Sequence, residues 1–397
     1  MKKISFILLS FIITALQLKA QEISDTKFGK GLINFTAKDN SFSVKFAPRF
    51  QYLSSSNYNF NENSSDNNTN TSFLIRRARL KFNGFAFTKK LTYKIELGLS
   101  NRDISGASKY TSNSPRIIMD AVIKWNFSGN FVLWAGQTKL PGNVERVISS
   151  ANLQLVDRSI LNSSFNIDRD VGFQLRHHFN LTDKFVIREK IAISQGEGRN
   201  VTVQNIGGLQ YTGRLELLPF GLFNKKGDYS GSDLQREQTP KLAISFTYDI
   251  NKNAVRNRSN MGSFMEIDTG LYQTDISTIF VDTMFKYNGF SFMGEYAYRK
   301  ADAPIVKNSD GTLTGMQVNE GNGLNLQIGY LLKNNWELAG RYSTVNIINN
   351  DIKKQYTIGL SRFIVGHKLK VQSDFSYLTI AGFRNNLLYR LQVDIHF

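Results

Sequence analysis

Arginine and lysine side chains cluster at a few places in this chain, and their types and spacing suit the binding of anions. An arginine fork pairs with two oxygens of a phosphate or carboxylate and keeps its charge at physiological pH. A ring of cations between low-dielectric walls concentrates anions, and several weak sites let them pass on. For any single arginine, a solvated charge or a contact with a lipid headgroup is an equally good interpretation. The cationic groups are Arg49; Arg76, Arg77 and Arg79 with Lys81; Arg146; and Arg176, Arg188 and Lys190.

The charge of the whole chain and its amino end narrow the choice of partner. Lysine and arginine number 49 against 32 acidic residues, a formal charge of +17. Such a charge fits nucleic acid, anionic lipid headgroups or a cationic water-filled pore. Lys2 and Lys3 precede an apolar run to Leu18, so residues 1–20 are interpreted as a secretory signal before a mature start at Gln21. Secretion argues against nucleic acid.

The cations must be positioned by elements in which apolar and polar residues alternate. In the last such segment every second residue is apolar, and the residues between are polar or charged. This period of two predicts β-strands with one face against lipid and the other along an aqueous lumen. The two sets are Tyr389, Leu391, Val393, Ile395 and Phe397, and Arg390, Gln392, Asp394 and His396.

Sixteen such segments follow one another from residue 42 onward. Strands of about nine to eleven residues cross an outer membrane when tilted. Because an open sheet edge cannot face lipid, the strands must close on themselves, and sixteen of them enclose water. The prediction is all-β: a sixteen-stranded antiparallel transmembrane β-barrel, one domain over residues 21–397. The segments are 42–53, 73–87, 91–102, 116–127, 130–138, 170–180, 184–194, 203–217, 240–250, 276–287, 289–299, 323–332, 335–345, 354–363, 367–378 and 386–397.

The connections alternate between long and short, as they do when loops lie outside the cell and turns lie in the periplasm. One connection, 218–240, is long where a short turn is due, and we interpret it as an extra hairpin or a plug. The long connections are 54–71, 103–115, 139–169, 251–275 and 300–322, and the short ones are 88–90, 128–130, 180–183, 288 and 333–335.

One residue of the arginine cluster has the wrong parity. Ala78 and Leu80 share the lipid face, so Arg77 and Arg79 face the lumen and Arg76 falls on the lipid side. An arginine facing lipid at the bilayer midplane costs about 2–4 kcal/mol. Arg76 is therefore expected near the interface, at a bulge or beneath a folded loop.

Several stretches resemble the phosphate-selective porin O and P family. The stretch 73–84, Phe-Leu-Ile-Arg-Arg-Ala-Arg-Leu-Lys-Phe-Asn-Gly, is similar to the family's second strand, and 168–172, Asp-Arg-Asp-Val-Gly, is similar in form. The stretches Met119-Asp120-Ala121, Ala135-Gly136-Gln137 and Glu145-Arg146 with Ser149-Ser150 are also similar. The resemblance implies a homotrimer whose inward-folded third loop forms a constriction.

The resemblance also implies a set of site residues. It assigns the central anion site to Arg49, Arg76, Arg77 and Asp120, with Arg146 where the family has lysine. Arg79, Lys81, Arg256 and Arg258 are expected at the mouth of the pore. The family's arginine ladder comes from a later loop, and here residues 253–262 supply only Arg256 and Arg258. High phosphate affinity is therefore less expected than anion preference.

The expected function is an outer-membrane diffusion channel for small anions, with phosphate as the candidate, in a Gram-negative bacterium. A porin for other solutes remains the alternative. An enzyme built on the histidines and an adhesive barrel are weaker interpretations, and no cofactor or metal is expected. Expected partners are outer-membrane lipid and the barrel-assembly machinery, which would read the terminal Phe397.

Overall fold

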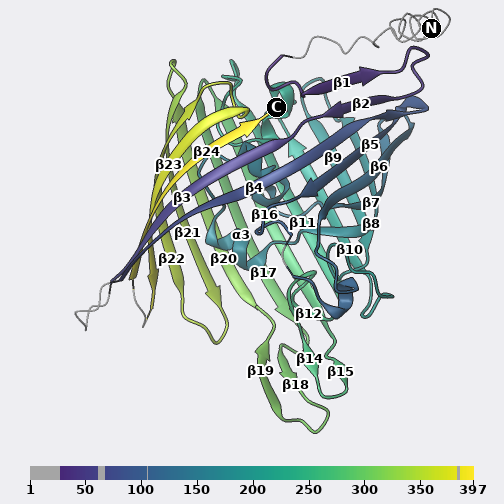
Figure 1. Cartoon of the computed structure of the whole chain (residues 1–397), viewed down its shortest axis with the longest axis vertical. Helices are drawn as coiled ribbons and strands as arrows, with labels where there is room; N and C mark the ends of the chain where they lie inside the picture. The colour runs from purple at the N-terminus through teal and green to yellow at the C-terminus, as the bar shows by residue number, and fades with distance from the viewer. Residues whose placement is uncertain (1–26, 61–67, 105, 382–384) are drawn as a thin grey trace, which may run out of the picture.

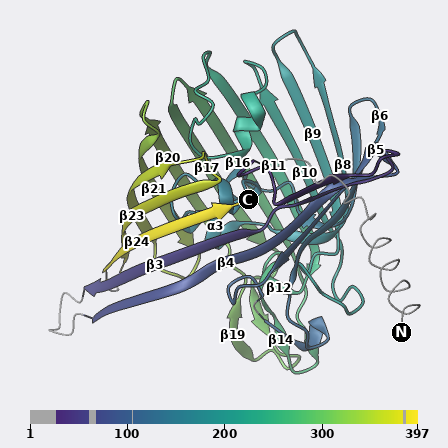
Figure 2. The same cartoon turned by 45° about the horizontal axis from the view of Figure 1, so that its top comes forward.

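The computed structural model describes residues 27–60, 68–104, 106–381 and 385–397. The expected signal, 1–20, lies outside these residues. Within them, sixteen antiparallel strands close into a barrel, because β24 pairs with β3 from Asn385↔Phe60 to His396↔Arg49 (Figures 1 and 2). The strands are β3 (Arg49–Phe60), β4 (Asn68–Ala86), β5 (Thr88–Gly98), β6 (Ile118–Ser128), β7 (Phe131–Lys139), β8 (Arg169–Asn180), β9 (Val186–Ser194), β10 (Gln210–Leu218), β11 (Lys241–Ala254), β16 (Thr274–Tyr287), β17 (Phe290–Ala301), β20 (Gly321–Leu331), β21 (Trp336–Ile347), β22 (Lys353–Phe363), β23 (Leu369–Ile380) and β24 (Asn385–His396). The predicted fold class is confirmed.

The alternation places apolar side chains outside and polar ones inside, the reverse of a water-soluble sheet. In β22, Ile358 is 57% exposed on the outer face, whereas its neighbour Thr357 is 5% exposed inside the barrel. Thr357 shares a 2.8 Å hydroxyl hydrogen bond with Ser376 of the adjacent strand. Lipid solvates the outer face, and cross-strand hydrogen bonds satisfy the inner one.

The first predicted segment, 42–53, is divided at Ala47-Pro48. Its first part is a separate strand, β2 (Ser43–Phe46), which pairs with β1 (Ile33–Thr36) and, at Phe46↔Phe82, with β4. Proline has no N–H for the ladder, so the strand is interrupted there. Only β3, which starts at Arg49, belongs to the barrel.

Three other predicted boundaries were wrong. Of the stretch 54–71, expected to be a loop, residues 54–60 belong to β3 and 68–71 to β4, and 61–67 lie outside the described residues. Ser55–Ser72 and Ser56–Thr71 hydroxyls bond across the two strands at 2.9 Å. The turn placed at 88–90 is Phe87 alone, with φ +63°. The eighth strand begins at Gln210 instead of 203, after two adjacent glycines.

The connections differ sharply between the two ends of the barrel. The end opposite the carboxyl terminus carries the long loops and their small hairpins (Figure 1). The other end has short turns, except for 219–240, which we call the inner strap and which contains η3 (Asn224–Tyr229). The hairpins pair β12 (Arg256–Arg258) with β13 (Met261–Phe264), β14 (Glu266–Ile267) with β15 (Gly270–Leu271), and β18 (Ile305–Lys307) with β19 (Leu313–Gln317).

The loop between β7 and β8, residues 140–168, is the third long loop and carries short helices. They are α2 (Val144–Val147), η2 (Ser150–Asn152) and α3 (Ile160–Phe165); a further one-turn helix, η1 (Lys109–Thr111), lies in the second loop. Across the part of the chain that the structure describes, no helix is both long and apolar enough to span a membrane.

Candidate functional site

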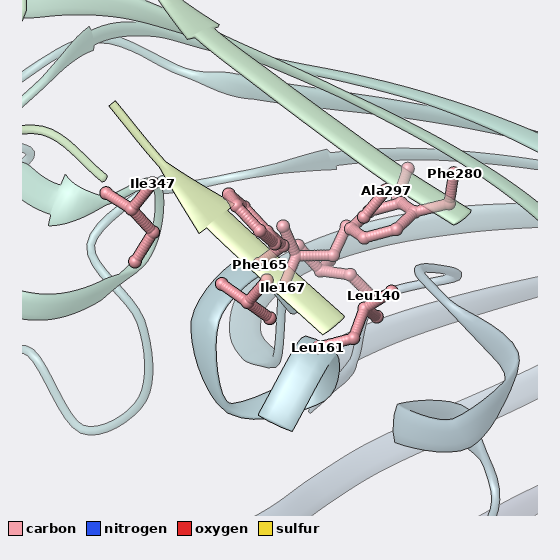
Figure 3. Packing of buried hydrophobic residues seen from close by; sticks show 9 residues of the cluster. Leu140, Leu161, Phe165, Ile167, Phe280, Ala297 and Ile347 are labelled. Carbon is pink, nitrogen blue, oxygen red and sulfur yellow. The ribbon is translucent and has the colours of Figure 1, made fainter. Parts of the chain in front are cut away.

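The third loop lies inside the barrel and packs against one side of its wall (Figure 2). Leu161, Phe165 and Ile167 are fully buried in a cluster with Phe280 of β16 and Ala297 of β17 (Figure 3). Burying each large apolar side chain stabilises this position by about 1.5–3 kcal/mol. The loop therefore fills the half of the lumen that is lined by β16, β17, β20 and β21.

Polar contacts fix the other side of the loop. The Arg49 guanidinium donates to the Ser150 carbonyl at 3.0 Å and the Ser150 hydroxyl at 2.8 Å, while Asp394 binds its other edge at 2.5 and 2.9 Å. The Lys370 ammonium donates to the Leu153 carbonyl at 2.9 Å. The loop is thus tied to β3, β23 and β24 as well, and it crosses the lumen.

The remaining half of the lumen holds a cavity of about 560 Å³ between the third loop and the wall of β4–β8. Fourteen arginine and lysine side chains line it, against four carboxylates. With low-dielectric walls on one side, such an excess gives a strongly positive potential. The cations are Arg76, Arg77, Arg79, Lys94, Arg102, Arg116, Lys124, Lys139, Arg146, Arg158, Arg169, Arg176, Arg199 and Arg256, and the carboxylates are Glu96, Asp103, Asp120 and Asp168.

A β-bulge explains the parity of Arg76. In the β3–β4 ladder Gln51 faces Arg77 and Tyr52 faces Ile75, so Arg76 is an extra residue without a partner. The bulge turns Arg76 and Arg77 to the same side, and both line the cavity. Of the three placements considered for Arg76, the bulge is the one found, and the folded loop also covers it.

Carboxylates neutralise part of the cationic lining. Asp157 of the third loop binds the Arg76 guanidinium at 2.5 Å, and Asp103 binds Arg79 at 2.7 Å through both oxygens. Asp168 is paired with Arg146. Burial alone would raise the pKa of Asp168, but Arg146 and then Arg169 hold that pKa far below its usual range. These carboxylates stay ionised, so they reduce the positive potential of the cavity but do not reverse it.

Asp120 is the acidic centre of the β5–β8 wall. Its carboxylate accepts from Lys94 at 2.7 Å, from Arg169 at 3.1 and 3.2 Å and from the Thr138 hydroxyl at 3.0 Å. It is 1% exposed. Asp120 therefore offsets part of the positive charge of Lys94 and Arg169.

Seven lining cations contact neutral groups and form no salt bridge within the described ranges. Two of them, Lys139 and Arg158, donate to backbone carbonyls of the third loop, and the contacts of the other five follow. Arg77 bonds the Gln51 amide oxygen, and Arg199 bonds the Asp103 carbonyl. Lys124 and Arg176 lie over the Trp134 ring, at 3.8 and 3.5 Å from its centroid. The fifth is Arg256, which donates to the carbonyls of Glu197, at 2.7 Å, and Gly262. Neutral partners leave these charges available to an anion.

Four of the lining arginines come from long loops other than the third, which itself supplies Arg146 and Arg158. Arg102 and Arg116 belong to the second loop (99–117), Arg199 to the fourth (195–209) and Arg256 to the fifth (255–273), and all line the same cavity. Burial first, and then the nearby charge of Arg116, lowers the pKa of Arg256 to about 10, so it remains charged at neutral pH. A single loop supplies only part of this group; the fold collects the rest from other loops.

The predicted site residues are not all brought together. Arg76, Arg77, Arg79, Asp120, Arg146 and Arg256 line the cavity. Three do not: Arg49 clamps the third loop, Lys81 lies further along β4, and Arg258 donates to Asn166 at 3.2 Å.

Sequence reasoning missed several lining residues. Lys94 and Lys124 share the inward parity of strands β5 and β6, so the alternation could have identified them. Lys139 and Arg158 carry no such signal. Lys139 donates to the carbonyls of Arg146, Val147 and Ile148 at 2.7–3.2 Å, a contact that exists only once the third loop has folded.

The histidines and acidic residues do not assemble into a metal site. Within the described ranges, no group of three or more His, Cys, Asp and Glu side chains could hold a metal ion. His177 pairs with Glu189 at 3.0 Å, and His367 contacts the Gly231 carbonyl at 3.1 Å.

The barrel is similar to known porins. The anion-selective porin from Comamonas acidovorans has a TM-score of 0.54 at 10% identity, covering 90% of this chain and 100% of that one. DcaP, an outer-membrane channel of Acinetobacter baumannii, has a TM-score of 0.53 at 13% identity, and the match covers 91% of this chain and 99% of DcaP. OprB of Pseudomonas putida has a TM-score of 0.52 at 9% identity, and the match covers 89% of this chain and 94% of OprB. At these identities the likeness is one of fold. No curated protein matches the chain.

The sequence itself carries the family assignment. The model of the family described as phosphate-selective porin O and P matches residues 49–379, from the first barrel strand into β23. The chain therefore belongs to the phosphate-selective porin O and P family and is a porin of the Gram-negative outer membrane.

Proposed function

We propose that this porin selects small anions and that the selection takes place in the cavity between the third loop and the β4–β8 wall. The observation that carries the proposal is the excess of fourteen cations over four carboxylates around about 560 Å³. Field focusing by low-dielectric walls favours anions and repels cations. Arg76, Arg77, Arg146 and Asp120 form the centre of this site, and Arg49 contributes by holding the third loop.

An anion would meet the cations in sequence. Arg102, Arg116, Arg199 and Arg256 come from the outer loops and stand first. The central arginines follow, each already sharing its charge with a carboxylate or an amide. Arg176 and Lys124 lie on the halves of their strands that are nearer the short periplasmic turns, and they stand last. Several partly neutralised sites favour passage over tight capture, because conduction requires that a bound ion can leave.

Phosphate is the candidate solute, and other small anions are the alternative. Phosphate is supported by the guanidinium forks, which suit its oxygens in pairs. The alternative is supported by the carboxylates, because a cation already held by Asp157 or Asp168 binds a second anion more weakly. Release therefore favours modest affinity.

Single-channel current across a planar bilayer tests the proposal. Under a potassium chloride gradient the reversal potential should show anion preference, and phosphate added in the low millimolar range should then block chloride current. Anion preference without block would leave an anion porin with no phosphate site. A reversal potential favouring cations would reject the proposal.

We also propose a homotrimer anchored in outer-membrane lipid, as the family resemblance implies. The assembly machinery would read Phe397, whose amide donates to the Pro48 carbonyl at 3.1 Å and whose ring lies 5.7 Å from that of Phe28. Cross-linking of the protein in detergent would test the homotrimer. Comparing barrel insertion of the wild type with that of Phe397→Ala would test the role of Phe397. Loss of barrel insertion is the expected result for the variant.

A further inference from the structure

The inner strap, 219–240, occupies the short-turn end of the barrel, where the other turns have one to five residues. The strap does not extend away from the barrel into the periplasm. Most of its polar contacts are made with inward-facing groups of the wall and with the turns of the rim, so it lies inside the opening. Because the segment is much longer than a turn requires and is fixed to the wall by many contacts, we expect it to have a function of its own.

Buried charges of the wall hold the first half of the strap. The Lys286 ammonium of β16 donates to three strap carbonyls, those of Gly227, Ser230 and Ser232, at 2.8, 2.9 and 2.5 Å. Tyr229 bonds Glu216 of β10 at 2.8 and 3.0 Å. Burial raises the pKa of Tyr229 well above its usual value, so its hydroxyl stays protonated and can donate.

The second half follows the rim from the β16–β17 turn to the β22–β23 turn. Asp233 accepts from the Gly289 amide at 2.8 Å, and Arg236 donates to the carbonyls of Leu331 and Leu332 at 2.9 and 2.6 Å. His367 contacts the Gly231 carbonyl at 3.1 Å. The strap thus borders the half of the opening that lies below the third loop.

The strap touches the third loop directly. The Gly231 amide donates to the Asn152 carbonyl at 2.7 Å, and a Cβ at Gly231 would lie 2.5 Å from the Gln154 nitrogen, so only glycine fits. Ser232 and Gln154 bind the same carboxylate, Glu337, at 2.6 and 2.8 Å. Phe223 of the strap is buried in one cluster with Ile148 and Leu153 of the loop.

We propose that the inner strap is a specificity-determining element: it supports the third loop from the periplasmic side and so fixes the width of the anion path. The strap carries three basic residues (Lys225, Lys226, Arg236) and three acidic ones (Asp228, Asp233, Glu237). Its formal charge is zero, so its effect on selectivity is exerted through the position of the loop. This inference rests on the proposed function for its selectivity readout, whereas its conductance readout holds for a porin of any selectivity.

The first variant replaces residues 221–240 by Asn-Gly. Because Leu217 faces Ile244 in the β10–β11 ladder, the same register puts Phe220 opposite Lys241, where a two-residue turn closes a hairpin. The replacement leaves the net charge of the chain unchanged. Conductance should rise roughly twofold or more, and the anion-to-cation permeability ratio should fall towards one, because the pore widens and its charges move away from the ion.

A point variant keeps the inference testable if the deletion does not fold. Gly231→Ala forces the strap and the loop apart at their contact without altering any charge. Gly213→Ala is its matched control, since a Cβ at this β10 glycine meets no atom within 4 Å. Folding is checked by the heat-induced shift in gel mobility that barrels show.

The results separate the two proposals. Higher conductance in the folded deletion, with a smaller change in the same direction for Gly231→Ala and none for Gly213→Ala, supports the strap as the element that sets loop position. Wild-type conductance and permeability in both folded variants would overturn it, as would a wider pore with an unchanged permeability ratio. A wild-type channel without anion preference would instead refute the proposed function, and the conductance comparison would still decide the role of the strap.

Discussion

Replacing Arg77 by glutamine should remove one unit of charge from the anion path with little other disturbance. Arg77 bonds the Gln51 amide, and no salt bridge joins it to a described carboxylate, so the change leaves no acidic group without its partner. Arg79 and Arg146 differ in this respect, because each is paired with a carboxylate. Arg77→Gln is therefore the cleanest probe of the field in the cavity.

The size of the effect follows from the size of the cavity. A sphere of 560 Å³ has a radius of about 5 Å, so an ion at its centre lies about 6 Å from a charge in the lining. At that distance one charge contributes about 0.7 kcal/mol at an effective dielectric constant of 80 and about 1.4 kcal/mol at 40. Chloride should enter the cavity about three- to tenfold less readily and potassium more readily by the same factor, so the chloride-to-potassium permeability ratio should fall about ten- to hundredfold.

The reversal potential under a tenfold salt gradient around 0.1 M measures this ratio. At 1 M the Debye length of about 3 Å screens the charge, and the difference from wild type should almost vanish. Arg258→Gln removes the same charge outside the cavity lining and serves as the control. Arg77→Lys keeps the charge and should keep the ratio, with weaker phosphate block. Equal effects of Arg77→Gln and Arg258→Gln, or an effect of Arg77→Gln that persists at 1 M, would refute the reasoning.

Three further outcomes are expected. Asp157→Asn frees the Arg76 guanidinium, so phosphate should block chloride current at lower concentration than in wild type; unchanged block would mean that the pair does not govern affinity. Phe165→Ala should loosen the third loop by about 3–5 kcal/mol, seen as noisier and larger currents with barrel mobility on gels unchanged, whereas loss of the folded band would place this core in the barrel's own stability. Burial, and then Lys370, holds the pKa of His367 well below 6.5, so the unfolded chain binds more protons and the free energy of unfolding should decline as pH falls below about 6.5, by up to about 1.4 kcal/mol per unit. His367→Gln should flatten this decline in urea titrations at pH 7 and pH 5, and an identical decline in both proteins would exclude His367 as its source.

Much of the fold could be predicted from residue order, because it depends on an alternation that each strand carries by itself. The outer face of β22 and the inner face of β24 follow directly from every second residue. The errors arose where backbone chemistry overrides the pattern. Pro48 divides the first segment because it cannot donate to the ladder. Hydroxyl pairs such as Ser55–Ser72 bond across the first two strands, of which β3 extends to Phe60 and β4 begins at Asn68, into a stretch whose composition resembled a loop.

The site was predictable only where it shares that alternation. Arg77 and Arg79 were placed in the lumen by parity, and Arg76 was marked as irregular for the same reason. The bulge that resolves it needs the register between β3 and β4, which is a property of two strands. Arg102 and Arg116 lie on the second loop and Arg199 on the fourth, in segments without alternation, so their meeting in one cavity depends on how those loops fold over the barrel.

The sequence by itself determined the sixteen-stranded barrel, the sign of its lumen and the family to which it belongs. These properties depend on local periodicity, on composition and on short runs of residues, none of which requires knowledge of distant contacts. Only the tertiary structure decided which half of the lumen the third loop fills, which cations share their charge with a carboxylate, and that the inner strap lies beneath that loop. Those properties depend on contacts between residues as far apart as Gln154 and Glu337, which chain closure brings together and which no local pattern encodes.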